Sequence, residues 1–298
     1  MVKLYLMNKE KSFTLIELLV VIVIIGILAS VIIVSVSSSI NKANFAKAQS
    51  FSNTVQNELL GDLVSEWTFN SPAVSGKTED SWGNNDGTLY GANGLPELQT
   101  KENCVYGTCY SFDGTDDYVT VASNGLNKFS RQSFTISAWI QPKVTNNYVI
   151  IWSNDYTSHI APYYSQHLRI DNSKVYFAWN NGVSAQSIAT AVLISKDTWY
   201  HIVATYTSGS QKIYVNSKEE VTRNSTDIIS YYNQPVWIGK SNFAITKEVL
   251  IDDVRIYDAV ISSAQIKQQY VAGLDSLLAN GSIDKEEYAE RLNSLAQK

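Results

Sequence analysis

A long apolar segment near the N-terminus constrains this chain more than any other feature of its sequence. The run from Leu18 to Val34, LLVVIVIIGILASVIIV, contains no charged residue. At about 1.5 Å per residue, a helix of this length spans roughly 25 Å, which is close to the hydrocarbon thickness of a bilayer. We therefore expect residues 15–36 to form a helix that crosses a membrane once.

The apolar segment differs from a secretory signal peptide and from a simple anchor. Signal peptides carry an apolar region of about 7 to 15 residues and a small-residue cleavage site, whereas this segment is longer and ends in Ser-Val-Ser-Ser-Ser. Glu17 lies at its front edge. A carboxylate inside a membrane is costly and marks a function by default, so the segment is expected to do more than anchor the chain.

The stretch KSFTLIELLVVIVIIGILA resembles the leader and first helix of type IV pilins and pseudopilins. The resemblance implies that a prepilin peptidase cleaves between Ser12 and Phe13 and that Phe13 becomes an N-methylated first residue. It also implies that Glu17 pairs with the first amine of a neighbouring pilin subunit. Ser12 replaces the glycine that the family prefers, and Val34 stands where many major pilins have proline. The motif therefore indicates a minor pilin-like or pseudopilin-like protein.

Charge gives the expected orientation and excludes one class of partner. Three lysines precede the apolar segment and two follow it, namely Lys3, Lys9, Lys11, Lys42 and Lys47. This weak excess before the segment places the N-terminus in the cytoplasm and the C-terminal part outside the cell. The net charge of −5 and the lack of a basic cluster argue against a nucleic-acid partner.

The pattern changes from helical to strand-like at Leu63. Residues 13–62 are expected to form one long helix after a leader at 1–12, because the apolar positions keep helical spacing to Leu59. Beyond Leu63, short runs rich in Val, Ile, Tyr and Thr, such as SFTISAWI at 133–140, alternate with turn residues. About 12 to 14 strands are predicted, too many for one open sheet, so two packed antiparallel sheets are expected.

The order of motifs over residues 63–270 resembles the laminin-G-like, concanavalin A-like jelly-roll family. The motifs are WTFN, DSWGNNDGTLYGA, YSFDGTDDYVTV, FTISAWIQP, TWYHIVATY, KIYVNSK, VWIGK and LIDDVRIYDAVISSAQI. Residues 271–298 follow as a predicted helical hairpin, with Ser262 and Asp284 as N-caps and Gly281 as a terminator. This hairpin resembles the oligomerisation helix pairs of other bacterial proteins. The overall expectation is mainly β, with a long N-terminal helix.

The two cysteines, Cys104 and Cys109, are separated by four residues. They could be free thiols or a disulfide that closes a short hairpin. An extracellular location favours the disulfide.

Calcium is the one cofactor that the sequence indicates. Acidic residues gather in three places, and laminin-G-like domains often hold one calcium ion; the candidate ligands are Asp80, Asp86, Asp113, Asp116, Asp117, Asp252 and Asp253. The alternative is that these are ordinary turn residues, for which Asp is favoured.

A glycan or a surface protein is the expected ligand of the jelly roll. The best sequence candidate for a contact surface is the loop from Asn154 to His167, which carries Tyr156, Tyr163 and Tyr164 outside strict alternation. A purely structural filament subunit is the alternative. A surface glycanase is disfavoured, because the E-x-D-x-E signature is absent and the neighbouring Asp252 and Asp253 are expected to point to opposite faces of a strand.

Overall fold

The computed structural model divides the chain into two compact units, Met1–Asn57 and Glu58–Lys298. It describes residues 15–16, 18–25, 61–122, 126, 133–155, 164–230 and 234–295. In the first unit, residues 15–16 and 18–25 are helical and their apolar side chains are exposed. Ser12, Phe13 and Glu17 lie outside the described residues. Among the residues described, no helix is both long enough and apolar enough to cross a membrane.

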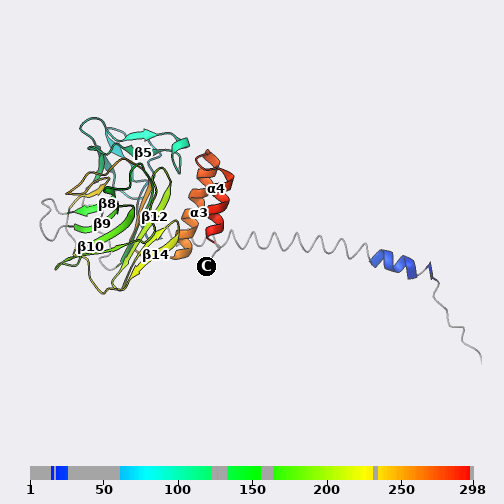
Figure 1. The fold of residues 1–298 in the computed structure, drawn as a ribbon. Helices are drawn as coiled ribbons and strands as arrows, with labels where there is room; N and C mark the ends of the chain where they lie inside the picture. The colour runs from blue at the N-terminus through cyan, green and yellow to red at the C-terminus, as the bar shows by residue number, and fades with distance from the viewer. Residues whose placement is uncertain are drawn as a thin grey trace, which may run out of the picture. The chain divides into compact units, whose positions relative to one another are not determined.

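Two antiparallel sheets make up most of the second unit (Figure 1). Sheet A has the order β14-β13-β12-β7-β16-β5-β4, with β1 paired to β16, and sheet B has the order β11-β10-β9-β8-β15-β6-β3-β2. The strands of sheet A are β1 (Leu63–Trp67), β4 (Glu97–Gln99), β5 (Cys109–Phe112), β7 (Ser133–Pro142), β12 (Tyr200–Thr207), β13 (Ser210–Val215), β14 (Lys218–Arg223) and β16 (Val249–Tyr257). Those of sheet B are β2 (Lys77–Thr78), β3 (Gly87–Tyr90), β6 (Tyr118–Val121), β8 (Val149–Asp155), β9 (Tyr164–Asp171), β10 (Lys174–Asn180), β11 (Ala185–Ala189) and β15 (Val236–Ile238).

The two-sheet jelly-roll sandwich confirms the predicted fold class. The strands described outnumber the prediction because β2, β4 and β15 have only two or three residues each. Such short segments show too little alternation to be recognised in a sequence.

The main core lies between the sheets and follows the predicted alternation. On β7, the side chains of Phe134, Ile136, Ala138 and Ile140 join this core, whereas Trp139 packs on the opposite face of sheet A. Trp139 is nevertheless fully buried. Sheet A is therefore covered on both of its faces.

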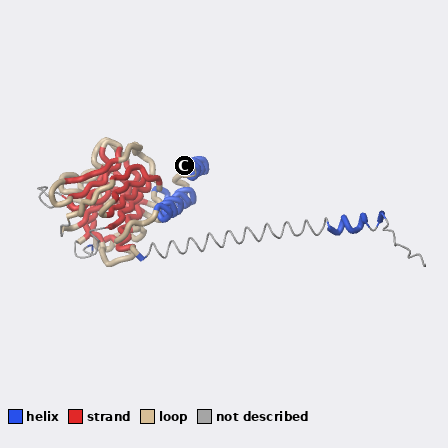
Figure 2. Tube along the Cα trace, turned by 90° about the horizontal axis from the view of Figure 1, so that it is seen from below, coloured by secondary structure: helices blue, strands red, loops and turns tan. Residues whose placement is uncertain are grey.

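Two C-terminal helices pack on the outer face of sheet A. Figure 2 shows helices at one side of the strands. A 3-10 turn, η1 (Lys101–Asn103), precedes the disulfide loop, and the helices are α3 (Ser263–Asn280) and α4 (Lys285–Ser294). A capping box between Ser262 and Gln265 starts α3, and Gly281, with φ 83°, ends it. Helix α3 is continuous through residue 271, whereas the sequence predicts that the jelly roll ends at 270 and the helical hairpin begins at 271.

The apolar side of the helix pair packs within the same chain. Tyr270, Leu274 and Leu277 lie in one buried cluster with Trp139 and Leu250 of sheet A. A Cβ atom on Gly273 would lie 2.1 Å from the Trp139 ring, so only glycine permits this close approach. The apolar face of the hairpin is therefore buried against its own sandwich. In an oligomerisation helix pair, as expected from the sequence, this face would pack against another subunit.

Candidate functional site

Two stacked tyrosines lie on the outer face of sheet B. Tyr90 of β3 and Tyr118 of β6 are direct register partners, and their rings stack with centroids 5.0 Å apart and an interplanar angle of 5°. Leu89 and Val119, their chain neighbours, point into the core, so strand alternation sends both tyrosines outward. Tyr90 is 45% exposed. Because each ring covers one face of the other, the pair presents ring edges and phenol groups to solvent.

Lys240 and Trp237 complete this surface, which we call the aromatic platform (Tyr90, Tyr118, Trp237 and Lys240). The Lys240 Nζ atom lies 4.0 Å from the ring centroid of Tyr118 and 5.1 Å from that of Trp237. These are cation–π distances. Burial lowers the pKa of Lys240, and the Tyr90 phenol partly opposes that shift. The ammonium group is thus partly removed from water and held against two rings.

A cavity of about 350 Å³ adjoins the chain segments that lead into the platform. Tyr148 and Phe243 meet edge to face in its wall, with centroids 5.2 Å apart. Its lining residues are Gly114, Thr115, Asn147, Tyr148, Phe243, Ala244, Ile245 and Lys247. The turn before Tyr118 and the loop after Lys240 both contribute to this wall. The same two chain segments therefore line the cavity and lead into the platform.

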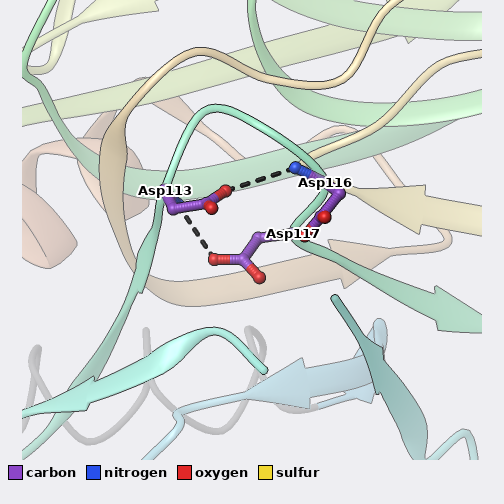
Figure 3. Close-up of side chains that lie close together, drawn as sticks. All are labelled: Asp113, Asp116 and Asp117. Atoms are coloured by element: carbon purple, nitrogen blue, oxygen red, sulfur yellow. Dashed lines mark hydrogen bonds between the residues drawn. The ribbon is translucent and has the colours of Figure 1, made fainter. Parts of the chain in front are cut away.

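Three aspartates gather on the turn between β5 and β6 (Figure 3). One oxygen from each of Asp113, Asp116 and Asp117 lies within 4.8 Å of the others. Asp113 Oδ1 accepts the amides of Thr115 and Asp116, and the Asp113 amide donates to Asp117 Oδ2 at 2.9 Å. We call this group the acidic turn.

The carboxylates of the acidic turn titrate differently. Burial alone would raise the pKa of Asp113, but hydrogen bonds from the backbone amides outweigh it and the pKa is lowered. Burial raises the pKa of Asp117, helped by the charges of Asp113 and Asp116. The Oδ1 atom of Asp116 is buried without a hydrogen-bond partner. Oxygens at these separations suit a Ca²⁺ ion, which takes several oxygens at about 2.3 to 2.6 Å.

A family model described as the concanavalin A-like lectin/glucanases superfamily matches residues 113–267, just over half of the chain. The chain belongs to this superfamily. A second model, the prokaryotic N-terminal methylation motif, matches residues 7–33. The expected combination of a type IV pilin motif with a lectin-like sandwich is therefore confirmed.

Solved structures with the same fold include bacterial toxin binding domains. Botulinum neurotoxin type C, from a study of its interaction with two ganglioside molecules, is 17% identical with a TM-score of 0.57; the match covers 73% of this chain and 53% of that chain. The binding domain of Paraclostridial mosquitocidal protein 1 gives the same values. The binding domain of botulinum neurotoxin DC in complex with rat synaptotagmin II is 17% identical with a TM-score of 0.56, covering 72% and 52%.

These likenesses concern the fold of the lectin-like sandwich. The chain spans about half the length of the toxin structures that it matches. A search of curated proteins gave no match.

The seven aspartates that the sequence raised as calcium ligands do not meet in one place. Asp113, Asp116 and Asp117 form the acidic turn, but the remaining four are engaged elsewhere. The Asp80 carboxylate accepts the amides of Glu66, Trp82, Gly83 and Asn85, and Asp86 accepts the Asp80 amide. These bonds shape the loop before β3, and they leave Asp80 little capacity for a metal.

Asp252 and Asp253 lie beneath the helices on sheet A, and the expectation that they point to opposite faces is wrong. Asp253 has φ 50° and interrupts the register of β16 with β7. This bulge puts both carboxylates near Tyr106. Burial raises the pKa of Tyr106, and the charges of Asp253 and Asp252 add to the shift. Asp253 also forms an ion pair with Arg255 at 3.0 Å. Their burial removes them from any surface chemistry.

The predicted tyrosine loop is only partly described. Tyr156 and Tyr163 lie outside the described residues, and of Tyr164 only the backbone is described, opposite Asp155 in the pairing of β8 and β9. The aromatic platform was missed because tyrosines on strands were assigned to packing. The pattern could have shown that both tyrosines face outward, since Tyr90 and Tyr118 alternate with core residues on their strands, but not that they meet.

Cys104 and Cys109 form the expected disulfide. The loop that they close is bonded to α3, because Asn280 donates to the Cys104 carbonyl at 2.7 Å and Ser276 donates to the Val105 carbonyl. The disulfide therefore supports the helix cover on sheet A, on the other side of the sandwich from the platform.

Proposed function

We propose that this chain is a minor pilin-like or pseudopilin-like surface protein that displays a lectin-like binding module. Its hydrophobic N-terminal helix inserts in the membrane and, after prepilin peptidase cleavage, assembles with other pilin subunits. The sandwich is held outside the cell and binds a glycan or a surface protein. The methylation motif at residues 7–33 supports the assembly role, and the superfamily match over residues 113–267 supports the binding role.

The aromatic platform is the observation that carries the binding role. Helices α3 and α4 cover sheet A, whereas the stacked pair Tyr90 and Tyr118 faces outward from sheet B. The C–H groups of a sugar pack against exposed aromatic rings, and phenol groups can bond to its hydroxyls. Exposed apolar groups rimmed by polar groups commonly mark interaction sites.

Binding, rather than catalysis, is the activity that the carboxylates support. The neighbouring pair Asp252 and Asp253 is buried beneath α3, where no polysaccharide can reach it. Gangliosides and synaptotagmin appear as binding partners in the descriptions of toxin structures that share this fold. Those partners belong to the toxins, and they favour recognition as the role of the fold here.

We propose in addition that the acidic turn holds one calcium ion. An ion bound by Asp113, Asp116 and Asp117 would fix the turn that forms part of the cavity wall through Gly114 and Thr115. Its role would be structural, stabilising the loops beside the platform.

The direct test is a glycan microarray probed with the detergent-solubilised full chain. We expect binding that becomes about tenfold weaker in Tyr118→Ala and Tyr90→Ala, since an aromatic contact contributes about 1 kcal/mol or more. Tyr288→Ala, on α4 over sheet A, is the matched control and should bind as the parent does. Absence of any glycan or protein ligand, with normal filament incorporation, would favour the purely structural subunit.

A further inference from the structure

The position of Lys240 in the aromatic platform is set by its backbone. Gly239, with φ +83°, turns the chain after β15, and a Cβ atom there would lie 2.8 Å from the ring of Phe112. Only glycine fits this conformation and this space. The Lys240 carbonyl then accepts a hydrogen bond from Ser153 Oγ at 2.7 Å. The backbone of Lys240 is thus fixed, and its side chain extends across the platform.

The ammonium group of Lys240 lies against two rings and, among the described residues, has no carboxylate partner. Some lysines of the sandwich have carboxylate partners, such as Lys143 with Asp197 at 3.2 Å and Lys212 with Glu219 at 2.7 Å. Within the described part of the chain, Lys240 forms no ion pair. Its lowered pKa reflects the loss of water around the charge. A partly desolvated cation without an anion gains more from an added anion than a hydrated one does.

We infer that the aromatic platform selects an acidic saccharide, a sugar whose C–H groups pack against the exposed parts of the Tyr90 and Tyr118 rings while its carboxylate or sulfate pairs with Lys240. This inference rests on the proposed glycan-binding function and names the ligand class of that site. A cationic ligand is excluded, because Lys240 already occupies the cation position over the Tyr118 and Trp237 rings. A neutral sugar would use the rings but would leave the ammonium unpaired.

The surroundings of the platform limit how much negative charge the ligand carries. Asp113, Asp116 and Asp117 of the acidic turn come directly before Tyr118 in the chain, and the chain as a whole carries a net charge of −5. A dense polyanion would meet repulsion from these groups, whereas one acidic group placed at Lys240 would not. We therefore expect glycans with isolated acidic residues to bind better than highly sulfated chains.

The test uses an array in which each uronic-acid oligosaccharide is printed beside its methyl ester, together with sulfated counterparts. The methyl ester keeps the ring and removes the charge, so each pair isolates the acidic group. The detergent-solubilised full chain should bind the free acids at least about tenfold more tightly than the esters, as expected for a charge-assisted hydrogen bond. Binding to sulfated but not to carboxylated members would identify sulfate as the source of the anion.

Three variants assign the preference to Lys240. Lys240→Met keeps an apolar stem over the rings and should abolish the preference for acids over esters. Lys240→Arg should retain it. Lys267→Met, an exposed lysine on α3, is the matched control and should behave as the parent does. Thermal unfolding of each variant confirms that the sandwich is intact.

The outcomes separate this inference from the proposed function. Equal binding of acids and esters, weakened by Tyr118→Ala, would overturn the acidic specificity and leave glycan binding standing. An acid preference that survives Lys240→Met would also overturn it. Failure to bind any glycan would overturn both.

Discussion

The carboxylate of Asp252 accepts hydrogen bonds from the backbone amides of Val105 and Tyr106, at 2.9 and 2.8 Å and across up to 147 positions of sequence. Both amides lie inside the loop that the disulfide closes, and α3 bonds to the carbonyls of the same loop. Asp252 on β16 therefore joins the central strand of sheet A to the disulfide loop, and through it to the C-terminal helix. Its contribution is structural.

Removing the Asp252 carboxylate should strongly destabilise the sandwich. In Asp252→Ala, the buried amide of Val105 and the partly buried amide of Tyr106 lose their acceptor, and we expect a loss of about 2 to 4 kcal/mol in the free energy of unfolding. Asp252→Asn retains one accepting oxygen and should lose less. Urea denaturation of the two variants measures the difference, and equal losses would show that the amide bonds are not the reason.

The buried acids should give the sandwich a specific dependence on pH. Burial raises the pKa of Asp253 from 3.8 to about 6, although Arg255 opposes the shift and Glu66 adds to it; burial and Asp253 also raise the pKa of Asp252. The folded state thus keeps a proton that the unfolded chain has released. This stabilisation is complete below about pH 4 and is lost as the pH rises through about 6.

Asp253→Asn removes this titration. Relative to the parent, the variant should gain up to about 3 kcal/mol of unfolding free energy between pH 4 and pH 7. Denaturation curves at pH 4 and pH 7 give the difference in unfolding free energy between variant and parent at each pH. The loss of the ion pair with Arg255 that is common to both pH values cancels when the two differences are compared. If the parent instead became more stable relative to the variant as the pH rises, the pKa of Asp253 would be lowered in the folded state, not raised.

Reduction of the disulfide should loosen the same region. The bond links residues five positions apart, and closing so short a loop stabilises the fold by about 2 kcal/mol on chain-entropy grounds. The Cys104→Ser/Cys109→Ser double variant should lose that amount, and hydrogen exchange should rise first in α3. Unchanged exchange in α3 would show that the loop does not support the helix.

Local patterns were sufficient to predict the sandwich and its helix caps. Alternation on β7 identified its core face, because residues such as Phe134 and Ile136 repeat with period two. Ser262 with Gln265, Gly281 and Asp284 marked helix ends through hydrogen bonds that span only a few residues. These features depend on neighbours in the chain, which a single sequence contains.

The candidate site depends on register between distant strands, which the sequence does not contain. Tyr90 and Tyr118 stack only because β3 and β6 pair with those residues opposite each other. The bulge at Asp253 requires a left-handed backbone at an aspartate, and nothing local distinguishes it from its neighbour Asp252. Sequence reasoning therefore found the strands but not the surface that they assemble.

Calcium should stabilise the sandwich through the acidic turn. Millimolar Ca²⁺ should raise the melting temperature of the full chain, and a chelator should reverse the shift, because binding to the folded state alone adds to its stability. The double variant Asp113→Asn/Asp116→Asn should show no shift. Glu290→Gln, an exposed acid on α4, should respond as the parent does. A shift of equal size in the double variant would place the ion elsewhere.

Glu17 tests whether the N-terminal segment assembles or only anchors. Its resemblance to the pilin motif predicts a pair between its carboxylate and the first amine of a neighbouring subunit, and two charges are tolerable in an apolar setting only when paired. Glu17→Ala should leave membrane insertion and calcium or glycan binding by the sandwich unchanged, while incorporation into filaments is lost. Sheared surface fractions, probed by immunoblot against whole-cell membranes, measure the two separately. Normal incorporation of the variant would reduce residues 15–36 to an anchor. Retained membrane insertion with lost incorporation in a Ser12→Lys variant would show that cleavage precedes assembly.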